Sequence, residues 1–508
     1  MSTVNGSPPA LTELFEQALD PPPAAGPSLV PRLAEPAHDR SEPLPGVLPV
    51  SRAVVVELQR QASAAISSAQ AGSTLTGESD RRQLGLSVVN RTVSEWAARY
   101  AATDPLTEAQ EALLRQAVYD ELFRAGPLQP LLDDARVENI TINGSHVQVT
   151  YADRPPQTWP AVADSDRALV DLVNRLARMS GQGERALTPA TPNLNMRLPD
   201  GSRLAASYWI TPTPQIVIRR HRTRGTTIDQ HVQWGSIDST LAAFLKAAVR
   251  ARKNVVIVGA QNAGKTSLLR ALAREIPAGE RVGTLESEFE LYLHEEPDGL
   301  QVVPFEARES NGERGPDGRL QGEITLSDLF PQMLRMSLRR ILVGEVRSRE
   351  VLPMLQAMSH GEGGSMCTLH AATPQQAIER LVTLCLEAGI GMTEGLAYRL
   401  IAQAVHLVVF LRYEDETTLV DARGRPGRQV RFVSHVMELA GIGEHGRPSV
   451  QMVFAPRESD LHREPRAVPH GNISPRCLAD LERAGFDRRL LTSPWGSWQH
   501  PLETVVPL

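Results

Sequence analysis

The sequence has very little lysine, and this scarcity makes each remaining lysine informative. Of its 53 basic residues only three are lysines, Lys246, Lys253 and Lys265, so the other 50 are arginines. Codon bias explains such a skew most simply. Since a planar guanidinium cannot replace a compact ammonium at every site, a retained lysine can still mark a position with a special requirement.

Cysteines and long apolar runs are also scarce. The three cysteines, Cys367, Cys385 and Cys477, are an odd number without C-x-x-C spacing, which argues against both a disulfide framework and a zinc site. No stretch approaches the roughly 18 apolar residues of a membrane span, and the first thirty residues do not resemble a secretory signal. We therefore expect a cytoplasmic protein that reaches a membrane only through a partner.

The overall charge argues against a protein whose whole surface binds nucleic acid. The net charge is −6 and the isoelectric point is near 6.2, although local basic patches remain compatible with these values. A hydrophobic content of 41% in 508 residues supports well-formed cores, and this length is typical of two to four domains.

Composition and periodicity suggest how the chain is divided. Eleven of the 38 prolines fall in the first 50 residues, which predicts a disordered arm there. Thr107 and Gln110 form a capping-box pattern before a helical repeat, so we expect a globular domain to begin at about residue 106. The predicted segments are a disordered arm (1–50), a helical and linker segment (51–105), a small α+β domain (106–225), a linker (226–235), an α/β domain (236–440) and a C-terminal extension without assigned chemistry (441–508).

The α/β assignment for 236–440 depends on six short apolar runs that alternate with helical patterns. The runs are NVVIV, RVGTLE, QVVPF, RILVGEV, SMCTLHA and HLVVFL. This alternation is typical of a parallel sheet with crossover helices.

A phosphate-binding motif follows the first of these strands. The pattern G-x-x-x-x-G-K-[ST] is followed by a helical run, and this context favours a P-loop over a chance match. Backbone N–H groups and the helix N-terminus would hold phosphate, Lys265 would reach the β- and γ-phosphates, and Thr266 would hold Mg²⁺. Lys246 and Lys253 are interpreted as solvated surface groups. The predicted nucleotide-binding residues are Gly259, Ala260, Gln261, Asn262, Ala263, Gly264, Lys265, Thr266 and Ser267.

Three further residues stand at the carboxyl ends of predicted strands, where such sheets bind ligands. Glu345 is the next-to-last residue of RILVGEV, and Glu286 ends RVGTLE. Either glutamate could manage the metal and the attacking water, and the simple alternative is a solvated strand-end residue. His370 ends another strand after a glycine run, where it is either a structural histidine or a γ-phosphate sensor.

Together these motifs resemble the secretion ATPases of the type II and type IV class, with the greatest likeness to the branch that powers tight-adherence (Flp) pilus assembly. The resemblance covers about residues 106–440 and includes GPLQPLLDD, ENITING, RLPDGSR, TLESEFEL, RILVGEVRSRE and MLQAMSHGEGGSMCTLHAATPQQAIERL in that order. It does not cover the first hundred residues or the last fifty.

The resemblance implies an ATP- and Mg²⁺-dependent RecA-like ATPase domain behind a smaller α+β domain. It also implies a homohexamer at the cytoplasmic face of the membrane, with an inner-membrane platform protein as partner and pilin-like substrates moved indirectly. By motif, the resemblance makes Gly259 to Thr266 the Walker A residues, Glu286 the Asp-box acid, Glu345 the Walker B acid and His370 the His-box histidine. Thr266 and Glu345 would then be the two residues that hold the metal ion. Arg203, Arg219 and Arg220 fall where the family supplies arginines to the phosphates, although a basic linker or weak nucleic-acid patch would also explain the latter pair.

Several positions depart from the family pattern. Ser287 follows Glu286 where a second acid is usual, Glu362 replaces the first histidine of the His box, and Arg339 or Arg340 stands where an aspartate usually precedes the Walker B strand. Gln261 and Asn262 replace small P-loop residues. Lys265, Thr266 and Glu345 remain, which favours an active ATPase. The alternatives are a nucleotide-binding scaffold ring with little turnover and, less favoured, a nucleic-acid translocase.

Overall fold

The structure is a computed structural model, and it describes most of the chain beyond the N-terminal arm. The predicted disordered arm, residues 1–50, lies almost entirely outside the described residues. The described residues are 32–33, 50–71, 78–100, 105–151, 154–181, 185–220, 225–296, 299–308, 310, 316, 321–360, 362–389, 391–421, 423–457, 464–470, 475–493 and 496–505. None of the helices in these ranges combines the length and apolarity that a membrane crossing requires.

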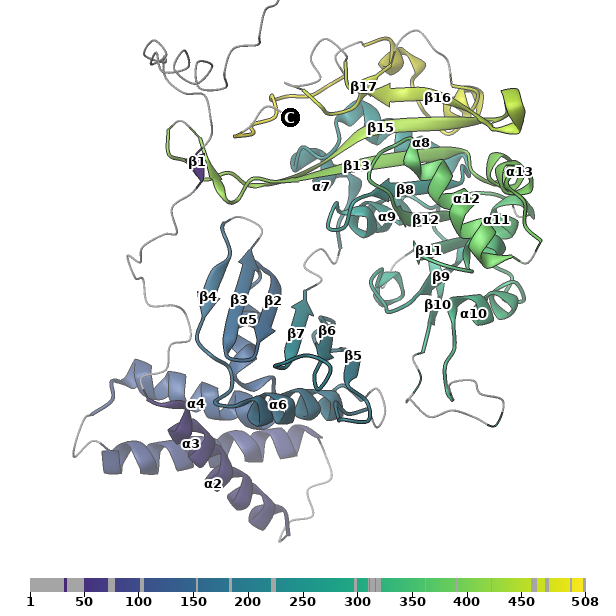
Figure 1. The fold of residues 1–508 in the computed structure, drawn as a ribbon. Coiled ribbons are helices and arrows are strands. Elements are labelled where there is room, and N and C mark those ends of the chain that lie inside the picture. The colour runs from purple at the N-terminus through teal and green to yellow at the C-terminus, as the bar shows by residue number, and fades with distance from the viewer. Residues whose placement is uncertain are drawn as a thin grey trace, which may run out of the picture.

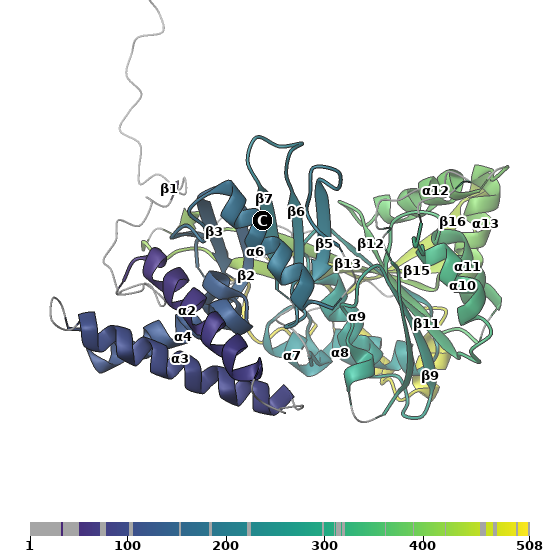
Figure 2. The ribbon, with the colours of Figure 1, turned by 90° about the horizontal axis from the view of Figure 1, so that it is seen from below.

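Three helices form a bundle at one end of the molecule (Figures 1 and 2): α2 (Arg52–Ala71), α3 (Glu78–Tyr100) and α4 (Glu108–Phe123). Leu58, Val88 and Leu114, one from each helix, are buried in a shared apolar core. The expected capping box begins α4: the Thr107 side chain accepts from the Gln110 N–H, and the Gln110 side chain accepts from the Thr107 N–H. The helical unit therefore continues past residue 105 to Phe123.

The next unit is an antiparallel sheet covered by helix α6 (Asp166–Met179). Its strand order is β4-β3-β2-β7-β6-β5, and a short 3₁₀ turn, η1 (Gly126–Leu128), and α5 (Gln129–Asp133) join it to the bundle. The core of this unit is formed by residues on one face of α6 and by alternate residues of the strands. The strands are β2 (Val137–Asn143), β3 (His146–Tyr151), β4 (Gln157–Trp159), β5 (Asn193–Arg197), β6 (Arg203–Ser207) and β7 (Gln215–Arg219).

A nine-stranded sheet forms the centre of the larger domain (Figure 1), in the order β10-β9-β11-β12-β8-β13-β15-β16-β17. All six predicted strands are present. They are the first six strands in this sheet order, and each pairs in parallel with its neighbours among the six. They are β8 (Val255–Gly259), β9 (Arg281–Glu286), β10 (Gln301–Glu306), β11 (Arg340–Val346), β12 (Met366–His370) and β13 (Leu407–Asp415). The expected α/β fold class, with a parallel sheet and crossover helices, is confirmed.

Helices cover both faces of this sheet, as an apolar parallel sheet requires. One core contains residues of α8 (Ser239–Arg250), α9 (Lys265–Ala273) and α14 (Leu478–Arg483). The other contains residues of α10 (Leu326–Met333), α11 (Val351–His360), α12 (Gln376–Ala388) and α13 (Glu394–Ala404). The short helix α7 (Ile228–Gln233) precedes α8, and the 3₁₀ turn η2 (Leu293–Glu295) follows β9.

The sheet continues beyond residue 440. The long strand β15 (Gln429–Ile442) pairs antiparallel with β13, and β16 (Pro448–Ala455) and β17 (Val468–Pro469) extend the sheet after η3 (Glu444–Gly446). Phe454 and Phe486 pack edge-on against Phe244 of α8, and η5 (Arg488–Thr492) follows. Much of the C-terminal extension thus belongs to the core of the larger domain.

A small two-stranded pairing joins β1 (Arg32–Leu33) to β14 (Leu419–Val420).

Candidate nucleotide-binding site

A cavity of about 930 Å³ lies where the two sheets and the C-terminal chain meet. Its lining includes Lys265 after β8, Glu345 of β11, His370 of β12, Arg203 of β6 and Trp498 near the C-terminus. The carboxyl ends of β8, β11 and β12 therefore face the same space, because parallel strands end at the same edge of a sheet.

The loop after β8 has the tight backbone that a phosphate cradle requires. A Cβ atom at Gly259 would lie 2.5 Å from the Leu411 carbonyl oxygen, so this close approach leaves no room for a side chain. Gly264 has a φ of +89° and is the N-cap of α9, a conformation that favours glycine. Since α9 begins at Lys265, its first N–H groups have no partner within the helix and can attract an anion.

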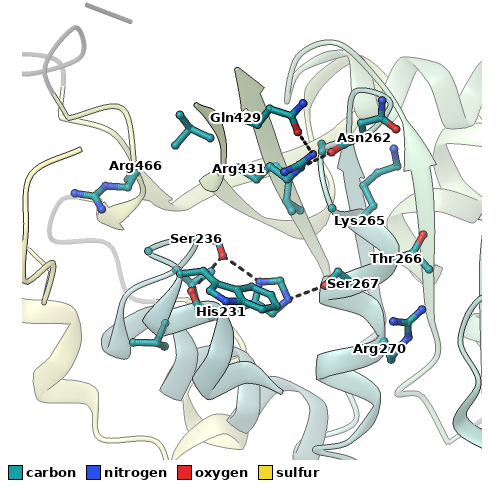
Figure 3. A pocket seen from close by; sticks show the side chains of 18 of the residues that line it. His231, Ser236, Asn262, Lys265, Thr266, Ser267, Arg270, Gln429, Arg431 and Arg466 are labelled. Atoms are coloured by element: carbon teal, nitrogen blue, oxygen red, sulfur yellow. Dashed lines mark hydrogen bonds between the residues drawn. The ribbon is translucent and has the colours of Figure 1, made fainter. Parts of the chain in front are cut away.

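Lys265 is 7% exposed and points its ammonium toward this loop (Figure 3). Its Nζ donates to the carbonyl oxygens of Gly259 (3.1 Å) and Ala260 (2.8 Å), and lies 3.1 Å from Nδ1 of His370. Burial lowers the pKa of Lys265 to about 8, although the nearby Glu345 opposes that shift. The ammonium is thus held in place but incompletely stabilised.

Glu345 joins the same group of side chains. His370 Nε2 lies 2.8 Å from Glu345 Oε1, and Arg347 donates to Glu345 Oε2 at 2.6 Å. Burial disfavours the ionised carboxylate, but the contacts with His370 and Arg347 outweigh burial and lower the Glu345 pKa to about 2. The structure therefore brings Lys265, His370 and Glu345 into one continuous set of contacts, with an ionised carboxylate at its end.

Glu286 lies outside the lining of this cavity. It is 1% exposed, and its Oε2 accepts the N–H groups of Glu290 and Leu291, both at 2.7 Å. Burial raises its pKa to about 7. Glu286 thus shapes the loop after β9, and it is Glu290 of that loop which lines the cavity and accepts from the Thr266 hydroxyl at 3.1 Å.

The oxygen donors around Thr266 suit a magnesium ion. Thr266, Glu290 and Glu345 all line the cavity, and Mg²⁺ prefers oxygen ligands while keeping several of its waters. Within the described residues no cluster of three or more His, Cys, Asp or Glu side chains could hold a metal by itself, so an ion here would also need phosphate or water ligands.

The three predicted arginines have different surroundings, although all line the cavity. Arg203 forms ion pairs with Glu288 and Glu290 and donates to the Glu288 carbonyl oxygen at 3.2 Å. Arg219 is exposed, and its charge helps to lower the Lys265 pKa. Arg220 donates to the backbone carbonyl oxygen of Asp134, which turns its guanidinium toward the end of α5 in its own domain.

Several residues that line the cavity belong to none of the sequence motifs. Arg431 of β15 donates to the carbonyl oxygen of P-loop residue Asn262 at 2.8 Å, and Figure 3 shows the two side by side. His231 of α7 is buried, with Ser236 Oγ 3.1 Å from Nδ1 and Ser267 Oγ 3.3 Å from Nε2, and burial lowers its pKa to about 4. The alternating glutamates of TLESEFEL could have indicated Glu290, but no local pattern distinguishes the other lining residues.

Two of the departures from the family pattern lie away from the cavity. Glu362 is exposed and pairs with Arg252 at 2.8 Å. Arg340 pairs with Glu280 at the opposite end of β11 from Glu345. Neither substitution touches the P-loop or the strand ends that face it.

Comparison with known proteins identifies the family of this chain. A family model described as "Type II/IV secretion system protein" matches residues 126–442, which is more than half of the chain. The chain is 28% identical over 335 residues to the type IV secretion system protein VirB11 of Brucella suis, covering 60% of this chain and 87% of that protein. It is 33% identical over 147 residues to the type IV secretion system protein PtlH of Bordetella pertussis, covering 28% and 40%. The X-ray structure of the Legionella pneumophila ATPase DotB matches at 20% identity with a TM-score of 0.42, covering 61% of this chain and 80% of that chain.

Proposed function

The chain belongs to the type II/IV secretion system protein family, and we propose that it is the ATP-hydrolysing motor subunit of a pilus-assembly machine of the tight-adherence (Flp) type. It is a P-loop ATPase by fold and family. The observation that carries the ATP-hydrolysing part of the proposal is the contact series Lys265–His370–Glu345 inside one cavity, because it links a phosphate-binding cation through a histidine to an ionised acid.

Each group has a distinct task in hydrolysis. Lys265 and the first turn of α9 bind the β- and γ-phosphates. Glu345, ionised at neutral pH, accepts a hydrogen bond from the attacking water and so orients it, while His370 holds the carboxylate from the other side. When bound, Mg²⁺ neutralises charge on the phosphate oxygens, and Thr266 and Glu345, with Glu290, are the groups that would hold it.

The arginines divide between binding and positioning. Arg219 is exposed and lines the cavity, and we assign it to phosphate binding. Arg203 reaches the same cavity from the N-terminal sheet and is held there by Glu288 and Glu290. An arginine supplied by a separate domain makes charge stabilisation depend on domain closure, which can couple hydrolysis to movement. Arg220 also lines the cavity, but its guanidinium donates to the Asp134 carbonyl oxygen, so we assign it a role in the structure of its own domain.

Assembly and location complete the proposal. The motor is a homohexamer at the cytoplasmic face of the membrane that works on an inner-membrane platform protein and moves pilin-like subunits indirectly. The curated relatives are named as type IV secretion system proteins, which supports work on a membrane machine. Measurement of the particle mass with and without ATP checks the ring, and a monomer under both conditions would contradict it.

The three lysines supply a test of the ATPase with matched controls. We expect Lys265→Ala to lose ATP binding and phosphate release, since it removes the buried ammonium beside the P-loop. Lys246→Ala and Lys253→Ala should keep both, because these lysines pair with Asp229 and Asp480 outside the catalytic residues. The measurements are calorimetric ATP binding and phosphate release by the full chain.

The same assays separate the alternatives. Phosphate release from the wild type that does not exceed that of Lys265→Ala would exclude a motor, and ATP binding without release would favour a nucleotide-binding scaffold. Strong stimulation by DNA that falls steeply with added salt would favour a nucleic-acid translocase instead.

A further inference from the structure

We propose that the C-terminal segment Ser497–Leu502 forms one wall of a subsite for the base and ribose of the bound nucleoside triphosphate. The proposal rests on the proposed function, because it needs phosphates at the P-loop. The family match ends at residue 442, so this wall lies outside the part of the chain that the family shares.

The segment lines the same cavity as the P-loop. Figure 3 shows Lys265 and Thr266 at one end of the pocket and Arg466, which contacts the segment, at the other, with His231 and Ser236 between them. The volume of about 930 Å³ lies near the upper end of the range of roughly 300–1,000 Å³ for small-molecule sites. A triphosphate at the P-loop therefore leaves room toward Arg466 for the rest of a nucleotide.

Hydrogen bonds fix the start of the segment to the beginning of α8. The Ser497 N–H donates to Asp238 Oδ2 at 2.6 Å, and the Thr240 N–H donates to Ser497 Oγ at 3.1 Å. Asp238 is 2% exposed and also caps α8 by accepting the Leu241 N–H at 2.7 Å. A buried carboxylate shared in this way ties the C-terminal chain to the helix before the P-loop.

Arg466 fixes the next residues. Its guanidinium lies 4.0 Å from the centre of the Trp498 ring, and its Nη2 donates to the His500 carbonyl oxygen at 2.6 Å. Arg466 is itself 4% exposed and pairs with Glu464, while Trp498 Nε1 donates to the Ala467 carbonyl oxygen at 3.0 Å. The Trp498 ring thus has a fixed position on the cavity wall.

Helix α7 and the residue after it supply another wall of the same cavity. Trp234 lines the cavity with 55% of its surface exposed, and it packs edge-on against His231, 5.3 Å between ring centres. His231 in turn contacts Ser267, beside the P-loop. Two tryptophans with hydrogen-bonding groups around them suit a planar base, since aromatic rings stack on bases of any identity.

Comparing ATP with inorganic tripolyphosphate isolates this subsite, because tripolyphosphate has the phosphates but no base. We expect Trp498→Ala in the full chain to bind ATP about tenfold more weakly, equivalent to about 1.4 kcal/mol, while its affinity for tripolyphosphate stays unchanged. Removal of residues 497–508 should have the same selective effect. Trp209→Ala is the matched control, since Trp209 is an exposed tryptophan of the N-terminal sheet domain that does not line the cavity.

Any other result of these binding measurements contradicts the proposed subsite. Unchanged or tighter ATP binding after both changes would mean that the segment is irrelevant or obstructs the site. Equal weakening of ATP and tripolyphosphate would mean that the changes disturb the P-loop as a whole. If the wild type binds neither ligand, and Lys265→Ala does not differ from it, then the proposed function itself fails and the subsite with it.

Discussion

The three lysines of the chain have different surroundings, and only one of them needs to be a lysine. Lys246 and Lys253 were interpreted as solvated, yet both pair with carboxylates, Lys253 with Asp480 at 2.6 Å and only 14% of its side chain exposed. An arginine could form such pairs. Lys265 instead fits beneath two carbonyl oxygens of its own loop and against His370, where a wider guanidinium would collide.

The lowered pKa of Lys265 predicts a pH-dependent affinity for ATP. In the free protein burial lowers this pKa to about 8, and phosphate binding raises it because an anion favours the ammonium. Only the protonated fraction is competent to bind, so the ATP dissociation constant should be constant below pH 7 and rise about tenfold by pH 9. Calorimetry in two buffers of different ionisation enthalpy should detect proton uptake near pH 8.5, and a constant affinity from pH 7 to pH 9 would contradict the argument.

Glu345 is the residue whose removal should separate binding from hydrolysis. Glu345→Gln keeps the size and the contact with His370 but loses the charge that orients water, so we expect turnover to fall by roughly 100-fold or more while ATP still binds. Glu362→Gln is the control, because that glutamate is exposed and pairs with Arg252 away from the cavity. Equal turnover in the two variants would remove Glu345 from the mechanism.

At the scale of elements, the positions of the strands could be predicted better than the conformations of the loops and side chains at their ends. Most of the six parallel strands can be recognised as short apolar runs, because their residues are buried on both faces of the sheet. The edge strand β10 has no fully buried residue, so only its apolar composition predicts it. Glu286 shows where such prediction stops: its place at a strand end was evident from the sequence, but not that its carboxylate turns back to bind the Glu290 N–H. The direction of a side chain depends on the loop that follows, and no local pattern encodes it.

The start of β11 explains the arginine found where the family usually has an aspartate. The side chain of Arg340 is fully buried, with Nε 2.8 Å and Nη2 3.1 Å from the two carboxylate oxygens of Glu280. The same arginine explains a nearby glycine, since a Cβ at Gly364 would lie 2.5 Å from Arg340 Nη1. Gly364 is therefore required by the packing of Arg340.

This buried pair predicts a large loss of stability. Arg340→Ala leaves Glu280 without its main partner in a partly buried place, so we expect the unfolding free energy to fall by about 3 kcal/mol or more and the melting temperature by roughly 10 °C. Arg339→Ala, at an exposed neighbouring position, should change stability by less than about 0.5 kcal/mol. Thermal unfolding of both variants checks this, and similar melting temperatures would show that the pair contributes little.

At the scale of the whole molecule, the site is assembled from segments that are far apart in the sequence. Arg203 comes from the N-terminal sheet, Lys265 from the larger domain and Trp498 from the C-terminal chain. The P-loop was recognisable because its chemistry lies within eight consecutive residues. The C-terminal wall was not, because its position depends on the pairing of β15 to β17 and on a hydrogen bond to Asp238 from 259 residues away.

The contact between the N-terminal sheet and the larger domain gives the last prediction. Arg197 of β5 donates to Glu306 of β10 at 2.8 Å and lies over the Phe289 ring, while Glu306 also accepts the Phe289 N–H at 2.7 Å. Arg197 thus holds, through Glu306, the loop that carries Glu288 and Glu290 to Arg203. Arg197→Ala removes a half-buried ion pair and a cation–π contact, each worth up to about 1 kcal/mol. We expect amide exchange in residues 287–291 to accelerate roughly tenfold and turnover to fall with it, because the loop opens more often. Arg178→Ala, on the exposed face of α6, should change neither, and if exchange in residues 287–291 is the same in both variants, the two domains are not coupled through this contact.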